Sequence, residues 1–190
     1  MNAPDRVVSS EAEELILVDS NDEEIGFGSK ADCHDGEGIL HRAFSIFLFN
    51  DDGELLLQRR SESKRLWGGY WSNTCCSHPR RGESVDEATQ RRLHDELNAA
   101  ASLEFVYKFE YQARFGDLGA EYELCHVFLG RLNGRMQPNR EEIAGVRYVS
   151  PGDLALELDR NGDRYTPWLK LEWDRLTQDF TGQLANYTSL

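Results

Sequence analysis

The segment 71–78 (WSNTCCSH) places a thiol, Cys76, two residues before an imidazole, His78. A thiol exchanges protons near neutral pH when neighbouring positive charge or a metal tunes its pKa, and its small size suits contact with an apolar substrate. An intracellular cysteine is more commonly a small buried hydrophobe. Two interpretations of Cys76 therefore stay open from this segment alone, a proton-transfer group and a core residue.

Histidines and acidic residues elsewhere in the chain have the chemistry of metal ligands. Three histidines lie in or next to segments that are predicted to be loops or strand ends: His34, His41 and His78. Glu121 and Glu123 flank Tyr122 in a predicted strand. Residues at i and i+2 of a strand point to the same face, so the two carboxylates can converge on one ion. Imidazole with carboxylate suits Zn²⁺ or Mn²⁺, and the carboxylates widen the choice to Mg²⁺. Isolated surface or core histidines are the alternative.

Aromatic residues near these segments have two possible roles. Trp67 and Trp71 precede the cysteine pair, and Trp168 follows Thr166-Pro167 at a predicted helix start. The face of an aromatic ring stabilises a cation, most strongly in a dry site. Tryptophan is equally a good core residue, so the pattern does not choose between the two roles.

The charge distribution indicates which partners the chain binds. The net charge is −13, from 34 acidic and 21 basic residues, which disfavours nucleic acid and anionic membranes because the summed field repels polyanions. Pairs of basic residues are nevertheless concentrated in residues 59–92, and this concentration favours binding of a small anion. The alternative interpretation is that these side chains are ordinary solvated surface charges. These pairs are Arg59-Arg60, Lys64-Arg65, Arg80-Arg81 and Arg91-Arg92.

The four cysteines and the N-terminus bear on location. The first residues lack the basic and apolar regions of a secretion signal, and the chain has no uninterrupted apolar run of roughly 18 residues. In such a chain, thiols serve chemistry more often than a disulfide framework. We therefore expect a cytoplasmic protein that binds no membrane.

The hydrophobic patterning predicts one mixed α/β domain over residues 14–180, preceded by a disordered extension over 1–13 and followed by a flexible tail over 181–190. Ser84 and Glu87 form a capping-box pattern at the start of a central helix. An Asp-Gly turn predicts a hairpin. The predicted strands cover 14–19, 42–49, 54–60, 103–115, 121–132 and 143–149, and the predicted helices cover 84–101, 151–160 and 168–180.

Residues 77–83 (SHPRRGE) and 91–99 (RRLHDELNA) resemble a degraded Nudix box, Gly-x5-Glu-x7-Arg-Glu-U-x-Glu-Glu-x-Gly-U, the signature of a family that handles diphosphates. Arg92 stands where the box has its first helical glutamate, and that change weakens the Mg²⁺ cluster with which Nudix hydrolases activate water. The departure favours diphosphate binding without hydrolysis. Glu83, Arg91, Leu93 and Glu96 match the box, whereas Ser77, Arg92, Asp95 and Asn98 depart from it.

Joined to the segments WSNTCCSHP and EYELC, this box makes residues 14–180 similar to the type 1 isopentenyl-diphosphate isomerases. The resemblance implies a Nudix-like mixed-sheet α/β/α sandwich with C-terminal helices. It also implies interconversion of isopentenyl diphosphate and dimethylallyl diphosphate through a tertiary carbocation, in isoprenoid precursor biosynthesis. A Nudix hydrolase and a non-catalytic diphosphate-binding module are the rival interpretations, and the sequence leaves monomer and homodimer open.

The resemblance also implies a role for each matching residue. Cys76 would transfer protons on one face of the alkene, Glu123 with the help of Tyr111 would do so on the other, and Trp168 would shield the cation. Glu96 would help to place Mg²⁺ on the substrate diphosphate. One divalent metal, Zn²⁺, Mn²⁺ or Mg²⁺, would be held by His34, His41, His78, Glu121 and Glu123, and the diphosphate would meet Lys30, Arg60, Lys64 and Arg92.

Overall fold

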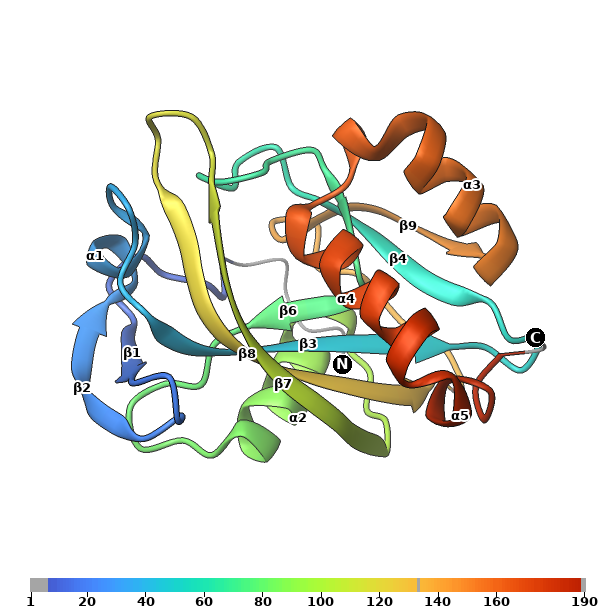
Figure 1. Ribbon diagram of the computed structural model, residues 1–190, viewed down its shortest axis with the longest axis horizontal. Coiled ribbons are helices and arrows are strands. Elements are labelled where there is room, and N and C mark those ends of the chain that lie inside the picture. Colours follow the sequence, from blue (N-terminus) through green and yellow to red (C-terminus); the bar gives the residue numbers. More distant parts are fainter. Residues whose placement is uncertain (1–6, 133, 189–190) are drawn as a thin grey trace.

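Strand β3 (His41–Phe49) lies at the centre of the sheet, with nearly all its side chains buried. The computed structural model describes residues 7–132 and 134–188. β3 pairs in parallel with β8 (Ala120–Arg131) over nine positions, and β8 pairs antiparallel with β7 (Leu103–Arg114). On its other side β3 pairs with the short β6 (Cys75–Ser77). Figure 1 shows β3, β7 and β8 crossing the middle of the molecule.

The predicted hairpin after β3 is right at its turn and wrong beyond it. β4 (Leu55–Arg60) pairs with β3 only where Phe49 faces Leu55, because the two strands then diverge. β4 pairs instead with β9 (Ile143–Val149) and with the two-residue β5 (Trp71–Ser72). Arg60, the last residue of β4, lines a pocket together with Cys76 of β6 and Glu123 of β8.

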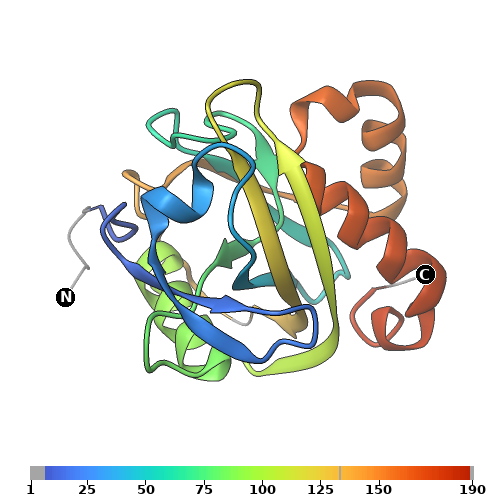
Figure 2. The ribbon, with the colours of Figure 1, turned by 60° about the vertical axis from the view of Figure 1, so that its left-hand side comes forward.

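Helices cover both faces of the sheet, as the sandwich prediction requires (Figure 2). α2 (Val85–Leu97) begins with the predicted capping box of Ser84 and Glu87, and it ends before the predicted residue 101 because Asn98 takes a left-handed conformation. α4 (Pro167–Asp179) covers the opposite face. α3 (Pro151–Asn161) and the 3-10 turn η1 (Gly162–Arg164) lead into α4.

Two elements near the N-terminus are not predicted from the sequence. β1 (Glu14–Val18) forms a hairpin with β2 (Glu24–Ser29), and α1 (Lys30–His34) follows directly. The patterning predicts neither β2 nor α1, because β2 is only half-buried and α1 is too short to show a helical period. The strand predicted over 14–19 is confirmed as β1.

The structure also corrects the expected termini. Residues 7–13 are not a disordered extension, since Val8 is buried and its backbone N–H donates to Glu142 Oε1 at 2.7 Å. The tail over 181–188 is likewise ordered, because α5 (Thr181–Leu184) buries Leu184 against α4 and β3. Residues 1–6, 189 and 190 lie outside the described part of the chain. Within the described residues, no helix is long and apolar enough to cross a membrane.

Candidate active site

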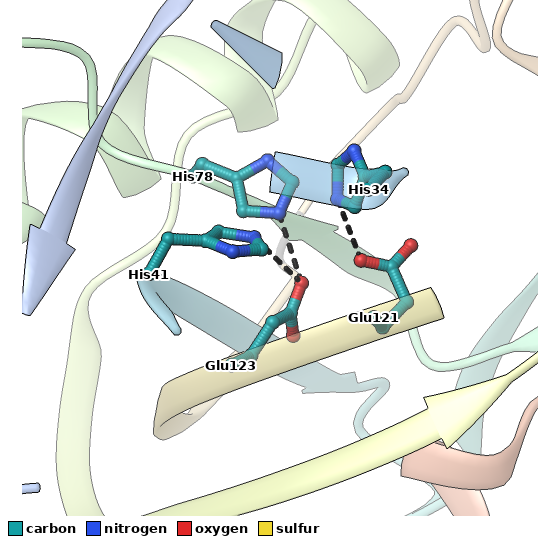
Figure 3. Close-up of side chains that lie close together, drawn as sticks. All are labelled: His34, His41, His78, Glu121 and Glu123. Carbon is teal, nitrogen blue, oxygen red and sulfur yellow. Dashed lines mark hydrogen bonds and ion pairs between the residues drawn. The ribbon is translucent and has the colours of Figure 1, made fainter. Parts of the chain in front are cut away.

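Three imidazoles and two carboxylates gather at one end of the central strands (Figure 3). One ligand atom from each lies within 4.8 Å of every other, so the structure brings together the whole predicted ligand set. Glu123 Oε1 lies 2.9 Å from His78 Nε2 and 3.8 Å from His41 Nε2, and Glu121 Oε2 lies 2.7 Å from His34 Nε2. The five residues are His34, His41, His78, Glu121 and Glu123.

Strand register explains most of this convergence. His41 begins β3 and stands opposite Glu123 of β8 in the parallel pair. Glu121 points to the same face two residues earlier, and His78 directly follows β6, the antiparallel neighbour of β3. His34 ends α1, which packs against β8. Four of the ligands therefore come from sheet geometry, and the fifth depends on the docking of α1.

Gly119 allows that docking. Its φ of +144° lies in the region that L-residues avoid, and a Cβ at this position would overlap the carbonyl oxygen of His34. The turn before β8 can therefore approach the end of α1 closely. His34 is held beside Glu121 as a result.

The ligand atoms have the protonation and the unmet bonding that suit a metal. His41 Nδ1 lies 2.7 Å from the carbonyl of Ile39, which can only accept, so His41 Nε2 presents its lone pair to the cluster. His34 Nε2, His41 Nε2 and Glu121 Oε2 are buried without a hydrogen-bond partner of good geometry in the described residues. Buried polar atoms left unpaired are costly unless a ligand binds them. The residues present fit a divalent cation.

Burial and neighbouring charge keep His41, His78 and Glu121 in the forms that bind metal. Burial lowers the pKa of His41 to about 4 and holds that of His78 well below its ordinary value, so both imidazoles are neutral at pH 7. Although burial opposes ionisation, the His34 imidazole beside Glu121 lowers the pKa of that carboxyl to about 2. Neutral imidazole and ionised carboxylate are the ligand forms.

Glu123 has a second partner on the pocket side. The Tyr111 hydroxyl donates a 2.6 Å hydrogen bond to Glu123 Oε2, while Glu123 Oε1 faces the histidines. Burial raises the pKa of Glu123 well above its ordinary value, and the neighbouring Glu121 adds to the rise. Burial likewise raises the pKa of Tyr111, so the phenol keeps its proton as a donor. Glu123 can therefore exchange protons on its Tyr111 side.

The two adjacent cysteines face opposite sides of β6. Cys75 is buried in the core beneath α2, whereas Cys76 packs beside the cluster that contains Tyr111 and Trp168. Burial raises the pKa of Cys76 to about 12, although Arg60 Nη1 lies 3.8 Å from its sulfur. Cys76 is consequently a neutral thiol at pH 7, the form that can donate a proton.

A pocket of about 630 Å³ joins these groups. That volume lies in the range of small-molecule sites. Both Cys76 and Glu123 line it, and so do Tyr111 and Trp168. The four basic residues predicted to meet a diphosphate also line it: Lys30, Arg60, Lys64 and Arg92.

Trp168 forms an apolar wall of the pocket. Its indole Nε1 donates to Ser72 Oγ at 2.9 Å, which fixes the ring at the start of α4. Trp67 meets the ring edge-to-face with centroids 5.3 Å apart. Trp71 lies elsewhere, with the guanidinium of Arg147 4.7 Å from the centre of its ring. Of the three candidate tryptophans, Trp168 alone lines this pocket.

The basic residues are already ordered by buried partners. Arg92 is paired with Glu96 one helical turn on, and its Nη1 donates to the carbonyl of Val8 at 2.9 Å. Arg60 donates to the carbonyls of Trp67 and Leu66 at 3.1 and 3.0 Å. Their positive charge is thus held at the pocket wall before any anion binds. Glu96 lies beneath Arg92 and does not itself line the pocket.

Glu142 is a site residue that the sequence reasoning misses. Its carboxylate pairs with Lys64, lies 3.8 Å from Arg92 and accepts from the Val8 N–H. Although burial opposes it, Lys64 and Arg92 lower the pKa of Glu142 to about 2. The sequence offers only an acidic pair, Glu141-Glu142, before a strand, and that pattern reads as surface charge.

Comparisons with known proteins agree with this geometry. Residues 39–169 match the model of the NUDIX domain. A protein of Photorhabdus laumondii named isopentenyl-diphosphate Delta-isomerase 1 is 39% identical, over 91% of this chain and 99% of its own length. The isopentenyl-diphosphate Delta-isomerase of Serratia proteamaculans is 45% identical, over 82% and 87%. A solved structure from Deinococcus radiodurans superposes with a TM-score of 0.65 at 25% identity, over 78% and 90%.

Proposed function

Because this chain belongs to the isopentenyl-diphosphate isomerase family of NUDIX-domain proteins, we propose that it interconverts isopentenyl diphosphate and dimethylallyl diphosphate. One observation carries the proposal beyond family membership. Cys76 and Glu123, which come from different strands, line one pocket together with four basic side chains. That arrangement suits proton transfer at both faces of an alkene tethered by a diphosphate.

The reaction moves a double bond by adding a proton at one carbon and removing another two carbons away. In one direction the Cys76 S–H proton goes to the alkene, a tertiary carbocation forms, and Glu123 takes a C–H proton to restore the double bond; the roles exchange in reverse. The neutral Cys76 thiol and the Tyr111–Glu123 hydrogen bond support these roles. Each proton-transfer group contributes about 10²–10⁴-fold to such rates.

Trp168 would stabilise the carbocation. Its ring lines the pocket and is held by the bond to Ser72, and an aromatic face attracts a cation most strongly where water is excluded. The ring is also 97% buried, so it presents little surface to solvent. The same wall keeps water from capturing the cation.

The metal would be held by the three histidines with Glu121 and Glu123, and it would supply positive charge that fixes Glu123 and favours its ionised form. Zn²⁺, Mn²⁺ and Mg²⁺ all accept carboxylate ligands, and the three imidazoles favour Zn²⁺ or Mn²⁺. On the protein side, the Tyr111 hydrogen bond leaves Glu123 Oε2 facing the pocket while Oε1 faces the histidines. The Glu123 carboxylate would thereby serve both the metal site and the substrate pocket.

The diphosphate would bind at the basic wall. Lys30, Arg60 and Lys64 line the pocket there, and the Nudix-box position of Arg92 adds a fourth cation where a hydrolase carries a carboxylate. Burial lowers the pKa of Lys30, so a bound dianion would strengthen its charged form. Glu96, which matches the box, would help to hold Mg²⁺ on the substrate diphosphate.

The direct test is to incubate the metal-loaded protein with isopentenyl diphosphate in D₂O and follow the products by NMR. Deuterium-labelled dimethylallyl diphosphate is the expected product. Release of phosphate or a monophosphate would instead identify a hydrolase. Binding without any conversion, unchanged after loss of both Cys76 and Glu123, would identify a non-catalytic module.

A further inference from the structure

Glu172 is a buried acidic residue that the mechanism above does not use. It lies in α4 one helical turn after Trp168, so both side chains face the sheet, and it is 0% exposed. The Cys125 thiol donates to its Oε1 at 3.4 Å. Its Oε2 is buried with no hydrogen-bond partner in the described part of the chain.

The contacts of Glu172 place it behind the two proton-transfer residues. Cys125 follows Glu123 by two positions on β8, so both project from the same face. Ser45, whose hydroxyl oxygen lies 3.5 Å from Cys125 Sγ, stands directly opposite Cys76 in the β3–β6 pair, and paired residues of an antiparallel ladder share a face. The carboxyl therefore lies on the sheet face from which Cys76 and Glu123 also project.

No positive charge balances this carboxyl. None of the described lysines, arginines or histidines lies within ion-pair distance of Glu172, and Arg175 of the same helix lies instead over the Tyr107 ring at 5.3 Å. Burial raises the pKa of Glu172 to about 8, because an unpaired buried carboxylate is unfavourable. The titratable groups facing it are Tyr107 from β7, Glu123 and Cys125 from β8, and Cys76 from β6; β3 contributes the uncharged Ser45.

We propose that Glu172 is a positioning residue that stays protonated during turnover, ties α4 to the strands behind Cys76 and Glu123, and keeps a further negative charge away from both. The inference deepens the proposed isomerase function and rests on it. A carboxylate at Glu172 would place a further negative charge on the buried sheet face from which Cys76 projects, and like charges repel most strongly where water is excluded. It would thus oppose the negative charge that the Cys76 sulfur gains when the thiol gives up its proton.

A packing role alone gives different expectations. Replacing a buried polar group by an apolar one of similar size is often neutral or stabilising, so measurements of stability do not distinguish a packing role from the proposed positioning role. The pH dependence of activity distinguishes them. Glu172→Gln keeps a neutral hydrogen-bonding group of the same shape but cannot ionise, whereas Glu172→Leu removes both the hydrogen bond from Cys125 and the titration.

The first measurement is the pH profile of kcat for the metal-loaded enzyme and its variants. We expect wild-type activity to decline above the Glu172 pKa of about 8. Glu172→Gln should keep most of its activity at pH 7 and move this decline upward by about one pH unit or more. Glu172→Leu should lower kcat at all pH values without a matching change in KM. Asp174→Asn, an exposed carboxyl of the same helix, should reproduce the wild-type profile.

The second measurement is independent of isomerase activity. Infrared difference spectra of wild type minus Glu172→Gln should contain a protonated carboxyl band at pH 7 that is replaced by a carboxylate band at pH 10. Superimposable pH profiles for wild type and Glu172→Gln, or a carboxylate band at pH 7, would overturn the proposal. A protein that shows the expected bands but makes no dimethylallyl diphosphate would refute the proposed function and leave the protonation of Glu172 established.

Discussion

The Tyr111 hydroxyl donates a 2.6 Å hydrogen bond to the Glu123 oxygen that faces away from the histidines. Tyr111→Phe removes this bond from a buried carboxylate, a loss typically of about 1–3 kcal/mol. We expect kcat to fall by about 10- to 100-fold with little change in KM or metal content. Tyr122→Phe is the matched control, because the Tyr122 hydroxyl donates to Glu110 on the outer surface rather than to the site. Equal activity of both variants would remove Tyr111 from the mechanism.

Cys76 and Cys75 provide a second matched pair. Cys76→Ala should abolish isomerisation, a loss of about 10²–10⁴-fold or more, while the fold and metal content persist. Cys75→Ala should retain activity and lose some stability, because it leaves a small gap beneath α2. Steady-state rates and thermal unfolding of both variants decide the matter. Near-normal turnover by Cys76→Ala would contradict the mechanism.

The sequence predicts the fold best where signals are local. The Ser84 and Glu87 cap, the Pro151 and Pro167 helix starts and the long strands all appear as expected. Strand pairing is different, because β3 takes most of its partners from β8 and β6 rather than from the adjacent β4. Such pairings depend on contacts between distant residues, which no local pattern specifies.

The same limit applies to the site. The i, i+2 spacing correctly aligns Glu121 with Glu123, since strand periodicity is a local property. The position of His34 depends on α1, which the patterning misses. The sequence does not identify Glu142 or Glu172 as site residues, because their burial and their contacts arise only in the folded chain.

Metal removal tests the ligand cluster directly. A chelator should inactivate the enzyme, and Zn²⁺, Mn²⁺ or Mg²⁺ should restore it, with Zn²⁺ or Mn²⁺ effective at the lowest concentration because of the three imidazoles. Activity assays should be run with metal analysis by mass spectrometry. A fully active protein free of metal would disprove the ligand assignment.

Gly119→Ala tests the docking of α1. The added Cβ meets the His34 carbonyl oxygen and strains a backbone at φ +144°, so His34 should shift away from Glu121. We expect metal affinity to fall by about 10- to 100-fold, as for loss of other groups that orient a ligand. Metal titration by calorimetry measures the change. Gly145→Ala in β9, where a Cβ meets open space, is the control, and a similar loss there would discount the explanation.

Glu142→Gln tests whether the buried carboxylate stabilises the basic wall. The folded pKa of Glu142 is depressed to about 2 from an ordinary 4.5, so its contribution is present above the unfolded value and is lost as the pH falls through that range. Urea unfolding of the metal-free protein at pH 7 should show wild type more stable than Glu142→Gln by on the order of 2 kcal/mol. The difference should shrink steadily towards pH 2. Glu141→Gln, which changes an exposed neighbour, should show no such trend. A difference that stayed constant with pH would mean that Glu142 acts through packing rather than through its charge beside Lys64 and Arg92.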